Sequence, residues 1–304
     1  MSAPEPANQN QPKRRSRHRR IRAISIAPAL VTLGNLLFGF AAIHFAAREV
    51  ELQSPIWDRL QVTNLALACY MIFAAMICDA LDGRLARLAR TTSDFGGQLD
   101  SLADVVSFGA APAFIAVRLV IEVSRNYVGA DPVVSPVAET AYGRFCWIAA
   151  AAYLACTALR LARFNVENVH DESAHMGFRG LPSPGAAGAL ISVVLLNQEV
   201  IPNISASLAR RSDLLAAAVP WVAIALGLLM VSRVPYIHLM NRFFRGKKPF
   251  WMLVTAVLAV LAFWLWPELV LAIALCGYAA SGPVLWLVRR GQHRFVPART
   301  EESS

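Results

Sequence analysis

Residues 29–47 read ALVTLGNLLFGFAAIHFAA and contain no Asp, Glu, Lys or Arg. About 20 apolar residues are needed for a helix to cross the hydrocarbon core of a bilayer, so this stretch is long enough to span a membrane. The same kind of stretch recurs at 60–78, 180–198, 214–232, 249–267 and 269–288. Two further spans, centred on 105–117 and 145–159, are broken by charged residues. The sequence therefore predicts an all-α, polytopic membrane protein with about eight transmembrane helices, the first of which is retained rather than cleaved as a signal peptide.

Composition excludes a water-soluble globular domain. Of the 304 residues, 56% are apolar and 16% are charged, whereas about 25% are charged in an ordinary soluble domain. The five cysteines lie in or at the ends of apolar spans without a C-x-x-C pair. This pattern indicates packing residues rather than disulfides or a zinc site.

Basic residues are distributed unequally over the connections between the predicted spans. Of the 29 Lys and Arg residues, 22 fall in alternate segments that include both chain termini, and seven fall in the other connections. Lys and Arg are held on the cytoplasmic side during membrane insertion. We therefore expect a protein of the inner, or cytoplasmic, membrane with both termini in the cytoplasm.

Residues 79–104, DALDGRLARLARTTSDFGGQLDSLAD, contain four aspartates at helical spacing, namely Asp79, Asp82, Asp100 and Asp104. The first two are three residues apart and the last two are four apart, so each pair shares one face of a helix. Between the pairs, residues 91–94 are cap and turn formers, and Gly96 and Gly97 break the helical pattern. The sequence therefore predicts a hairpin of two helices on which the four carboxylates converge.

Each aspartate in a membrane helix costs on the order of 2.5–3.5 kcal/mol on insertion scales, so four of them need compensating partners. One interpretation is a salt-bridged hairpin without chemistry, in which Arg84, Arg87 and Arg90 neutralise the carboxylates. The other is a site for one or two hard divalent cations, Mg²⁺ or Mn²⁺, which prefer oxygen ligands. The spacing favours the metal site and leaves the salt-bridged hairpin as the alternative.

Eight positions in this segment match the pattern D-x2-D-G-x2-A-R-x8-G-x3-D-x3-D without a departure in spacing. In this pattern the chain resembles the CDP-alcohol phosphatidyltransferases. The resemblance implies transfer of a phosphatidyl group from a CDP-linked lipid to an alcohol, with release of CMP. It also implies that Asp79, Asp82 and Asp100 bind a divalent cation, Mn²⁺ or Mg²⁺, and that Asp104 is the general base beside the metal and one of its ligands. The positions that would bind the donor nucleotide and phosphates are Gly83, Ala86, Arg87 and Gly96.

Other segments resemble the phosphatidylserine synthase branch of the same family, namely 28–43, 99–114, 158–166 and 178–188. This branch implies CDP-diacylglycerol as the donor, L-serine as the acceptor and about eight membrane helices. A homodimer is usual in the family. The active site is expected at the cytoplasmic face, because the lipid donor can keep its acyl chains in the bilayer while its head group reaches a polar cavity.

Polar residues in these segments are candidates for the substrate pocket: Asn35, Arg160, Arg163, Asn165 and Ser183. Asn35 either lines the nucleotide site or hydrogen-bonds a neighbouring helix. Arg160 and Arg163 share a helix face and suit a serine carboxylate or a lipid phosphate, although basic residues are expected at a cytoplasmic helix end in any case. Glycerol 3-phosphate or an inositol phosphate is the alternative acceptor, but it would demand more cationic groups. A cation-coupled transporter is the alternative class of protein.

Four regions are expected along the chain. The basic tail 1–27 has nothing to bury and is predicted to be disordered, with its charge acting on topology and anionic lipid. A nucleic-acid arm is disfavoured beside a membrane span, so no nucleic acid is expected as a partner. Residues 28–235 are predicted to form the catalytic transmembrane domain, followed by two transmembrane helices in 236–290 and a cytoplasmic tail in 291–304.

Overall fold

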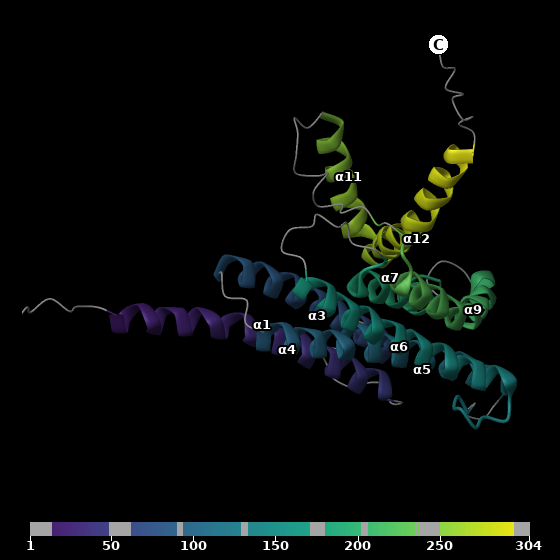
Figure 1. Ribbon diagram of the computed structural model, residues 1–304. Helices are drawn as coiled ribbons and strands as arrows, with labels where there is room; N and C mark the ends of the chain where they lie inside the picture. The colour runs from purple at the N-terminus through teal and green to yellow at the C-terminus, as the bar shows by residue number, and fades with distance from the viewer. Residues whose placement is uncertain are drawn as a thin grey trace, which may run out of the picture.

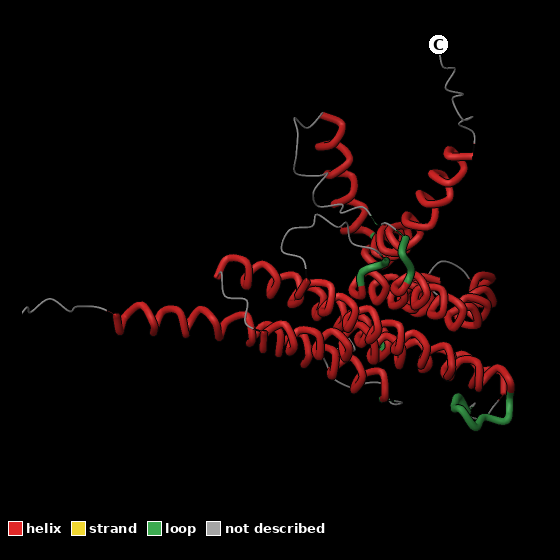
Figure 2. Tube along the Cα trace, in the orientation of Figure 1, coloured by secondary structure: helices red, strands yellow, loops and turns green. Residues whose placement is uncertain are grey.

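The computed structural model describes residues 14–48, 62–89, 94–128, 133–170, 180–201, 206–234, 236 and 250–294. These residues form helices and loops and contain no strand (Figure 2). The α-helices are α1 (Arg14–Ala47), α3 (Asn64–Ala89), α4 (Asp94–Asp104), α5 (Ala111–Val128), α6 (Ala141–His170), α7 (Ser183–Leu195), α9 (Ala206–Val231), α11 (Phe250–Leu265) and α12 (Pro267–Arg294). Two π-helical stretches accompany them: η1 (Val105–Ala110) joins α4 to α5, and η2 (Leu196–Val200) extends α7. The prediction of an all-α fold is confirmed.

Helix α7 lies at the centre of the arrangement. It packs against α3, α5, α9 and α12, and each of its residues except Pro184 is buried. A helix that is apolar all round belongs in the interior of a bundle. Helices α1, α3, α5 and α6 run side by side, whereas α11 packs against α12 and leans away from the bundle (Figure 1).

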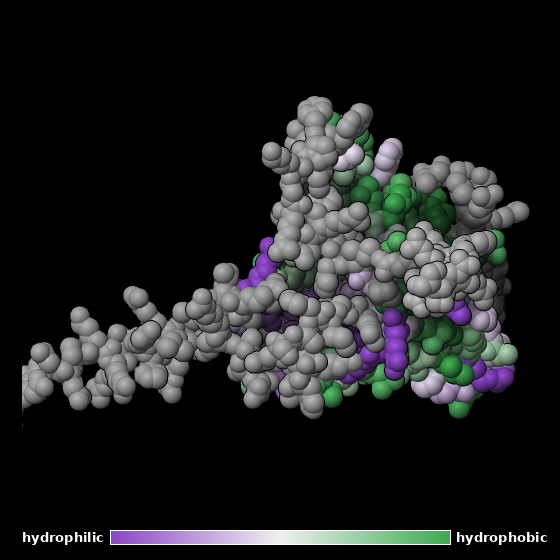
Figure 3. Space-filling model, turned by 45° about the horizontal axis from the view of Figure 1, so that its top comes forward, coloured by the Kyte–Doolittle hydropathy of each residue, from purple (hydrophilic) through white to green (hydrophobic). Residues whose placement is uncertain are grey.

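Six helical segments are long and apolar enough to cross a membrane, namely Pro28–Ala47, Asn64–Leu85, Phe95–Arg125, Ala141–Val166, Asp213–Val231 and Pro267–Val288. A polytopic membrane protein is therefore confirmed. The two remaining spans of the eight expected from the sequence are shorter helices, 183–200 and the 16-residue α11. Large apolar side chains are exposed on the outside of the bundle, as the green areas of Figure 3 show. Leu37 and Phe40, for example, each expose 65% of their surface, which suits contact with lipid.

A π-helical turn, η1, directly follows Asp104 in the third span. Pro112 lies just beyond this turn and has no N–H to donate to the carbonyl of Phe108, four residues earlier. That carbonyl accepts a hydrogen bond of 3.0 Å from the hydroxyl of Tyr153 on α6, and both residues are fully buried. An unsatisfied backbone group in hydrocarbon costs several kcal/mol. Tyr153 therefore compensates for the helix hydrogen bond that Pro112 removes close to the aspartate motif.

The structure corrects two local predictions. Residues 14–27, predicted to be disordered, belong to α1, because the chain has no proline between Pro12 and Pro28 and six of these 14 residues are the helix former Arg. Gly96 and Gly97, predicted to break the helix, lie within α4, which is held by its packing against α1. The remaining predicted tail residues, 1–13 and 295–304, and most of the predicted turn lie outside the described residues.

Candidate active site and metal centre

Three aspartates converge on one point, Asp79 from α3 and Asp100 and Asp104 from α4. Each offers a carboxylate oxygen, and the three oxygens lie within 4.8 Å of one another. Asp104 is buried, with 7% of its surface exposed, and the other two are partly buried. Carboxylate oxygens are the ligands that Mg²⁺ and Mn²⁺ prefer, and a cation would offset the mutual repulsion of three negative charges. This acidic trio is therefore a candidate metal centre.

The fourth aspartate, Asp82, does not belong to the acidic trio. It is buried one helical turn after Asp79, and its Oδ2 accepts a hydrogen bond from the hydroxyl of Thr32 on α1. The same hydroxyl lies 3.0 Å from the carbonyl oxygen of Pro28. Sequence reasoning missed Thr32, because a single threonine in an apolar helix gives no indication of its partner.

Asn35, also on α1, contacts the acidic trio directly. It is fully buried, and its Nδ2 donates a hydrogen bond of 3.1 Å to Oδ1 of Asp104. The backbone carbonyl of Asn35 accepts a hydrogen bond of 2.9 Å from the hydroxyl of Ser107 in η1. The structure thus shows the helix-to-helix contact that was one of the two interpretations of Asn35, and it makes this contact with a motif aspartate.

Arg160 on α6 brings a positive charge to the same region. Its Nη1 donates a hydrogen bond of 2.8 Å to the hydroxyl of Ser183 at the start of α7. The guanidinium lies close enough to Asp79 and Asp104 to interact with their charges, and Tyr278 of α12 lies nearby. A cation held between carboxylates and hydroxyls is suited to bind an anionic group of a substrate. Sequence reasoning missed Tyr278, because α12 carries no recognisable motif.

The donor-binding positions of the motif lie around the end of α3. Gly83 is exposed, and a Cβ atom added to it would meet no other atom within 4 Å, so the backbone there is open to a ligand. Gly96 is partly buried on α4. The side chains of Ala86 and Arg87 lie outside the described residues, as does Arg90. Within the described part of the chain, Arg84 forms no ion pair with a motif aspartate, which disfavours this part of the salt-bridged interpretation.

A comparison with family models decides the family. Residues 25–279 match the model described as CDP-alcohol phosphatidyltransferase. The protein belongs to this family. The match covers all four motif aspartates and extends beyond residue 235 to include Tyr278 on α12.

Relatives of this transferase share about a third of their aligned residues with it. The CDP-diacylglycerol–serine O-phosphatidyltransferase of Helicobacter pylori strain 26695 is 32% identical over 216 residues, which are 71% of this chain and 73% of the relative. The protein of the same name from strain J99 is 33% identical over 59% of this chain and 61% of its own length. The protein of that name from Methanocaldococcus jannaschii is 33% identical over 66% of this chain and 81% of its own length.

Asn165 connects two helices of the transferase beside the metal centre. Its Nδ2 donates a hydrogen bond of 2.8 Å to the hydroxyl of Ser101, which lies 3.0 Å from the carbonyl oxygen of Gly97. Because Ser101 directly follows Asp100, Asn165 fixes α4 against α6 at the level of the acidic trio. Arg163 lies on the same helix, three residues after Arg160, and is partly buried.

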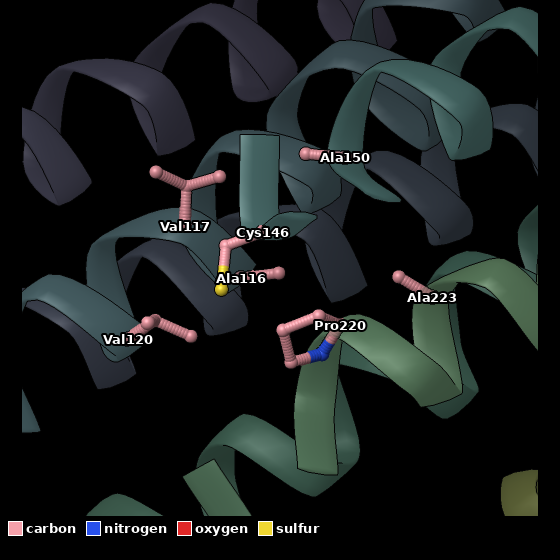
Figure 4. A pocket seen from close by; sticks show the side chains of 7 residues that line it. All are labelled: Ala116, Val117, Val120, Cys146, Ala150, Pro220 and Ala223. Carbon is pink, nitrogen blue, oxygen red and sulfur yellow. The ribbon is translucent and has the colours of Figure 1, made fainter. Parts of the chain in front are cut away.

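A small apolar pocket of the transferase lies between α5, α6 and α9 (Figure 4). Its lining residues are Ala116, Val117, Val120, Cys146, Ala150, Pro220 and Ala223. None of these side chains carries a charge, a hydroxyl or an amide. The pocket therefore has no groups to bind a nucleotide or an alcohol, in contrast to the acidic trio.

Proposed function

We propose that the protein transfers the phosphatidyl group of CDP-diacylglycerol to L-serine, giving phosphatidylserine and CMP. The observation that carries this proposal is the acidic trio, which the family motif forms from residues of two helices, α3 and α4. The three relatives bear the name of this activity and support serine as the acceptor.

The motif residues divide the chemistry between them. Asp79 and Asp100, with Asp82 one turn away, would hold Mn²⁺ or Mg²⁺ at the donor pyrophosphate. The bound cation would stabilise the negative charge that develops on the leaving CMP. Arg87 is placed by the motif to bind phosphate oxygens, and the open backbone at Gly83 allows close approach of the nucleotide.

Asp104 is the proposed general base. It accepts the proton of the serine hydroxyl while the hydroxyl oxygen bonds to the phosphorus that carries the diacylglycerol. The bond from this phosphorus to the bridging oxygen breaks, and CMP leaves with the electron pair. Asp104 then releases the proton to water. Such a base contributes about 10²- to 10⁴-fold to the rate.

The acceptor side is assigned to Arg160 and Ser183, with Arg163 and Asn165 at its edge. The guanidinium of Arg160 would bind the serine carboxylate, and the Ser183 hydroxyl holds this guanidinium in place. A phosphorylated acceptor such as glycerol 3-phosphate carries more negative charge and would require additional cationic partners. The arrangement therefore favours serine.

Orientation in the membrane follows from the distribution of basic residues. With 22 of the 29 Lys and Arg residues in alternate segments, we place both termini and the active site on the cytoplasmic side. Single cysteines introduced at Gly246 and at Ala130, with the five native cysteines replaced, test this orientation. A membrane-impermeant thiol reagent should label Gly246→Cys from the cytoplasmic side alone and Ala130→Cys from the opposite side alone. The reverse pattern would overturn the orientation.

One assay tests the reaction. Purified protein in lipid vesicles is given CDP-diacylglycerol, Mn²⁺ or Mg²⁺, and in separate reactions L-serine, glycerol 3-phosphate or inositol phosphate. We expect CMP and a new phospholipid with serine alone. Product with another alcohol would change the acceptor but keep the reaction, and no CMP release with any of them would overturn the proposal.

The homodimer also stays a prediction. Measurement of the protein's mass in detergent by light scattering checks it.

A further inference from the structure

Helix α1 forms a third wall of the active site, although the family motif lies entirely on α3 and α4. Thr32 and Asn35 are three residues apart and therefore share one face of α1. Thr32 is bonded to Asp82 of α3, and Asn35 is bonded to Asp104 of α4. One face of α1 thus contacts one aspartate from each motif helix.

The Thr32 hydroxyl has two acceptors within reach but a single hydrogen to donate. One acceptor is the Pro28 carbonyl within α1, and the other is the Asp82 carboxylate. A hydrogen bond to an ionised carboxylate is roughly twice as strong as one between neutral groups, so the hydroxyl donates to Asp82. Thr32 is 3% exposed and Asp82 is 7% exposed, so water has little access to replace this bond. Thr32 therefore fixes the orientation of the Asp82 carboxylate.

The Asn35 side chain is held in one orientation by its surroundings. Close packing of α1 against η1 holds its backbone, because a Cβ added to Gly39 would lie only 2.8 Å from Cα of Ser107, whose hydroxyl bonds the Asn35 carbonyl. Since a carboxylate oxygen can only accept, the amide must turn its NH₂ group toward Asp104. The amide oxygen Oδ1 is then buried without a hydrogen-bond partner among the described residues. Leaving a buried acceptor unsatisfied is unfavourable, so the contact with Asp104 determines how this amide is placed.

We propose that Thr32 and Asn35 are positioning residues for the transfer reaction: Thr32 orients Asp82 on the donor side, and Asn35 orients Asp104 on the acceptor side. This inference rests on the proposed function, because it takes its two sides from the roles given there to Asp82 and Asp104. It gives α1 a role in the reaction that the family motif, which lies on α3 and α4, does not indicate. It also predicts that replacement of Thr32 and replacement of Asn35 change different kinetic quantities.

Substitutions at Thr32 separate the hydroxyl from the shape of the side chain. Thr32→Val removes the hydroxyl and keeps the branched shape, whereas Thr32→Ser keeps the hydroxyl. We expect Thr32→Val to raise both the KM for CDP-diacylglycerol and the dissociation constant of Mn²⁺ about tenfold, as for the loss of one hydrogen bond to a charged group. Thr32→Ser should stay within about threefold of wild type. Mn²⁺ binding is measured without substrate from the electron paramagnetic resonance signal of the free ion.

Substitution at Asn35 should act on turnover instead. Asn35→Leu keeps the approximate volume and removes the NH₂ donor, so Asp104 loses its fixed orientation. We expect kcat to fall about 10- to 100-fold, since a misplacement of about 1 Å can cost 10²-fold. The KM for CDP-diacylglycerol should change less than about threefold. The Mn²⁺ dissociation constant should rise as well, because Asp104 is one of the acidic trio. Leu37→Ala, on the exposed side of the same helix, is the control and should leave all three quantities unchanged.

The results that would overturn the inference are distinct from a failure of the proposed function. It is wrong if Thr32→Val and Thr32→Ser behave alike, or if Asn35→Leu turns over at the wild-type rate. It is also wrong if kcat, donor affinity and Mn²⁺ affinity fall together in a variant whose melting temperature in detergent falls as well. In case Asn35→Leu does not fold, Asn35→Ala is measured in its place. If the wild-type protein uses an alcohol other than serine, the proposed acceptor is wrong. The positioning roles of Thr32 and Asn35 are then tested by kcat with that alcohol and by Mn²⁺ binding without substrate.

Discussion

The helices α1, α3 and α4 differ from α11 in where they keep their polar groups. The first three helices and η1 turn polar side chains inward, and the buried set includes Thr32, Asn35, Asp82, Asp104 and Ser107. Helix α11 turns apolar side chains outward, with Val260 69% exposed and Trp264 85% exposed. Both helical regions are apolar enough to lie in a membrane, but α11 contains no charged residue. The comparison teaches that polar residues inside a membrane protein mark function, whereas exposed apolar residues mark contact with lipid.

Removal of the metal should cause the largest loss of activity. In excess chelator, CMP release by the wild-type protein should fall to background, because three uncompensated carboxylates cannot hold the donor pyrophosphate. Added Mn²⁺ or Mg²⁺ should restore it. Full activity in chelator would show that the acidic trio has no metal role.

Replacement of the proposed base, Asp104, should have the second largest effect on activity. Asp104→Asn keeps the size of the side chain and removes its ability to accept a proton, so turnover should fall about 10²- to 10⁴-fold while CDP-diacylglycerol affinity changes little. Asp82→Asn should weaken donor binding as well as turnover. Steady-state kinetics and donor binding to the two variants, with melting temperatures as the folding control, check this asymmetry. Near wild-type turnover of serine by Asp104→Asn would disprove the base assignment.

The acceptor side should respond more weakly than the acidic trio. Arg160→Gln loses the charge proposed to bind the serine carboxylate, so the KM for serine should rise about tenfold with little change for CDP-diacylglycerol. Ser183→Ala leaves the guanidinium present but less fixed and should have a smaller effect. An unchanged KM for serine in Arg160→Gln would contradict the acceptor assignment.

Substitutions on α11 should have the smallest effect. Val260→Ala and Leu261→Ala remove apolar groups that are exposed on the outside of the bundle, and exposed substitutions usually change stability by less than about 0.5 kcal/mol. We expect activity within about twofold of wild type and little change in melting temperature in detergent. A tenfold loss of activity would contradict the contrast between α11 and the polar region, because it would show that α11 has a functional contact.

The features that depend on local sequence could be predicted before the structure. Hydropathy identified the helical, membrane-spanning character. The spacing of the aspartates predicted that four carboxylates converge, and three of them meet in the acidic trio. Both predictions use only residues that are close together in the sequence. The contact between Asn35 and Asp104 joins residues 69 positions apart, and no local pattern specifies which helix will lie beside α4.

Other features depended on packing that overrides local preference. Two adjacent glycines disfavour a helix, yet Gly96 and Gly97 are helical in α4. The sequence places Pro112 in the third span, but it did not show that a π-helical turn would precede this proline or that Tyr153 would satisfy the released carbonyl. The partner of Asp82, which lies outside the acidic trio, is likewise a residue of another helix, Thr32.

The position of Thr32 and Asn35 on the first helix also has a consequence for the order in which the chain is made. A ribosome produces α1 before α3 and α4, so the hydrogen-bond donors for Asp82 and Asp104 exist before either aspartate is synthesised. Each aspartate would cost on the order of 2.5–3.5 kcal/mol if it entered the bilayer alone. With α1 already in the membrane, the later helices have a polar surface to join as they leave the translocation machinery. The same contacts that orient the aspartates in the finished protein therefore also lower the cost of its insertion.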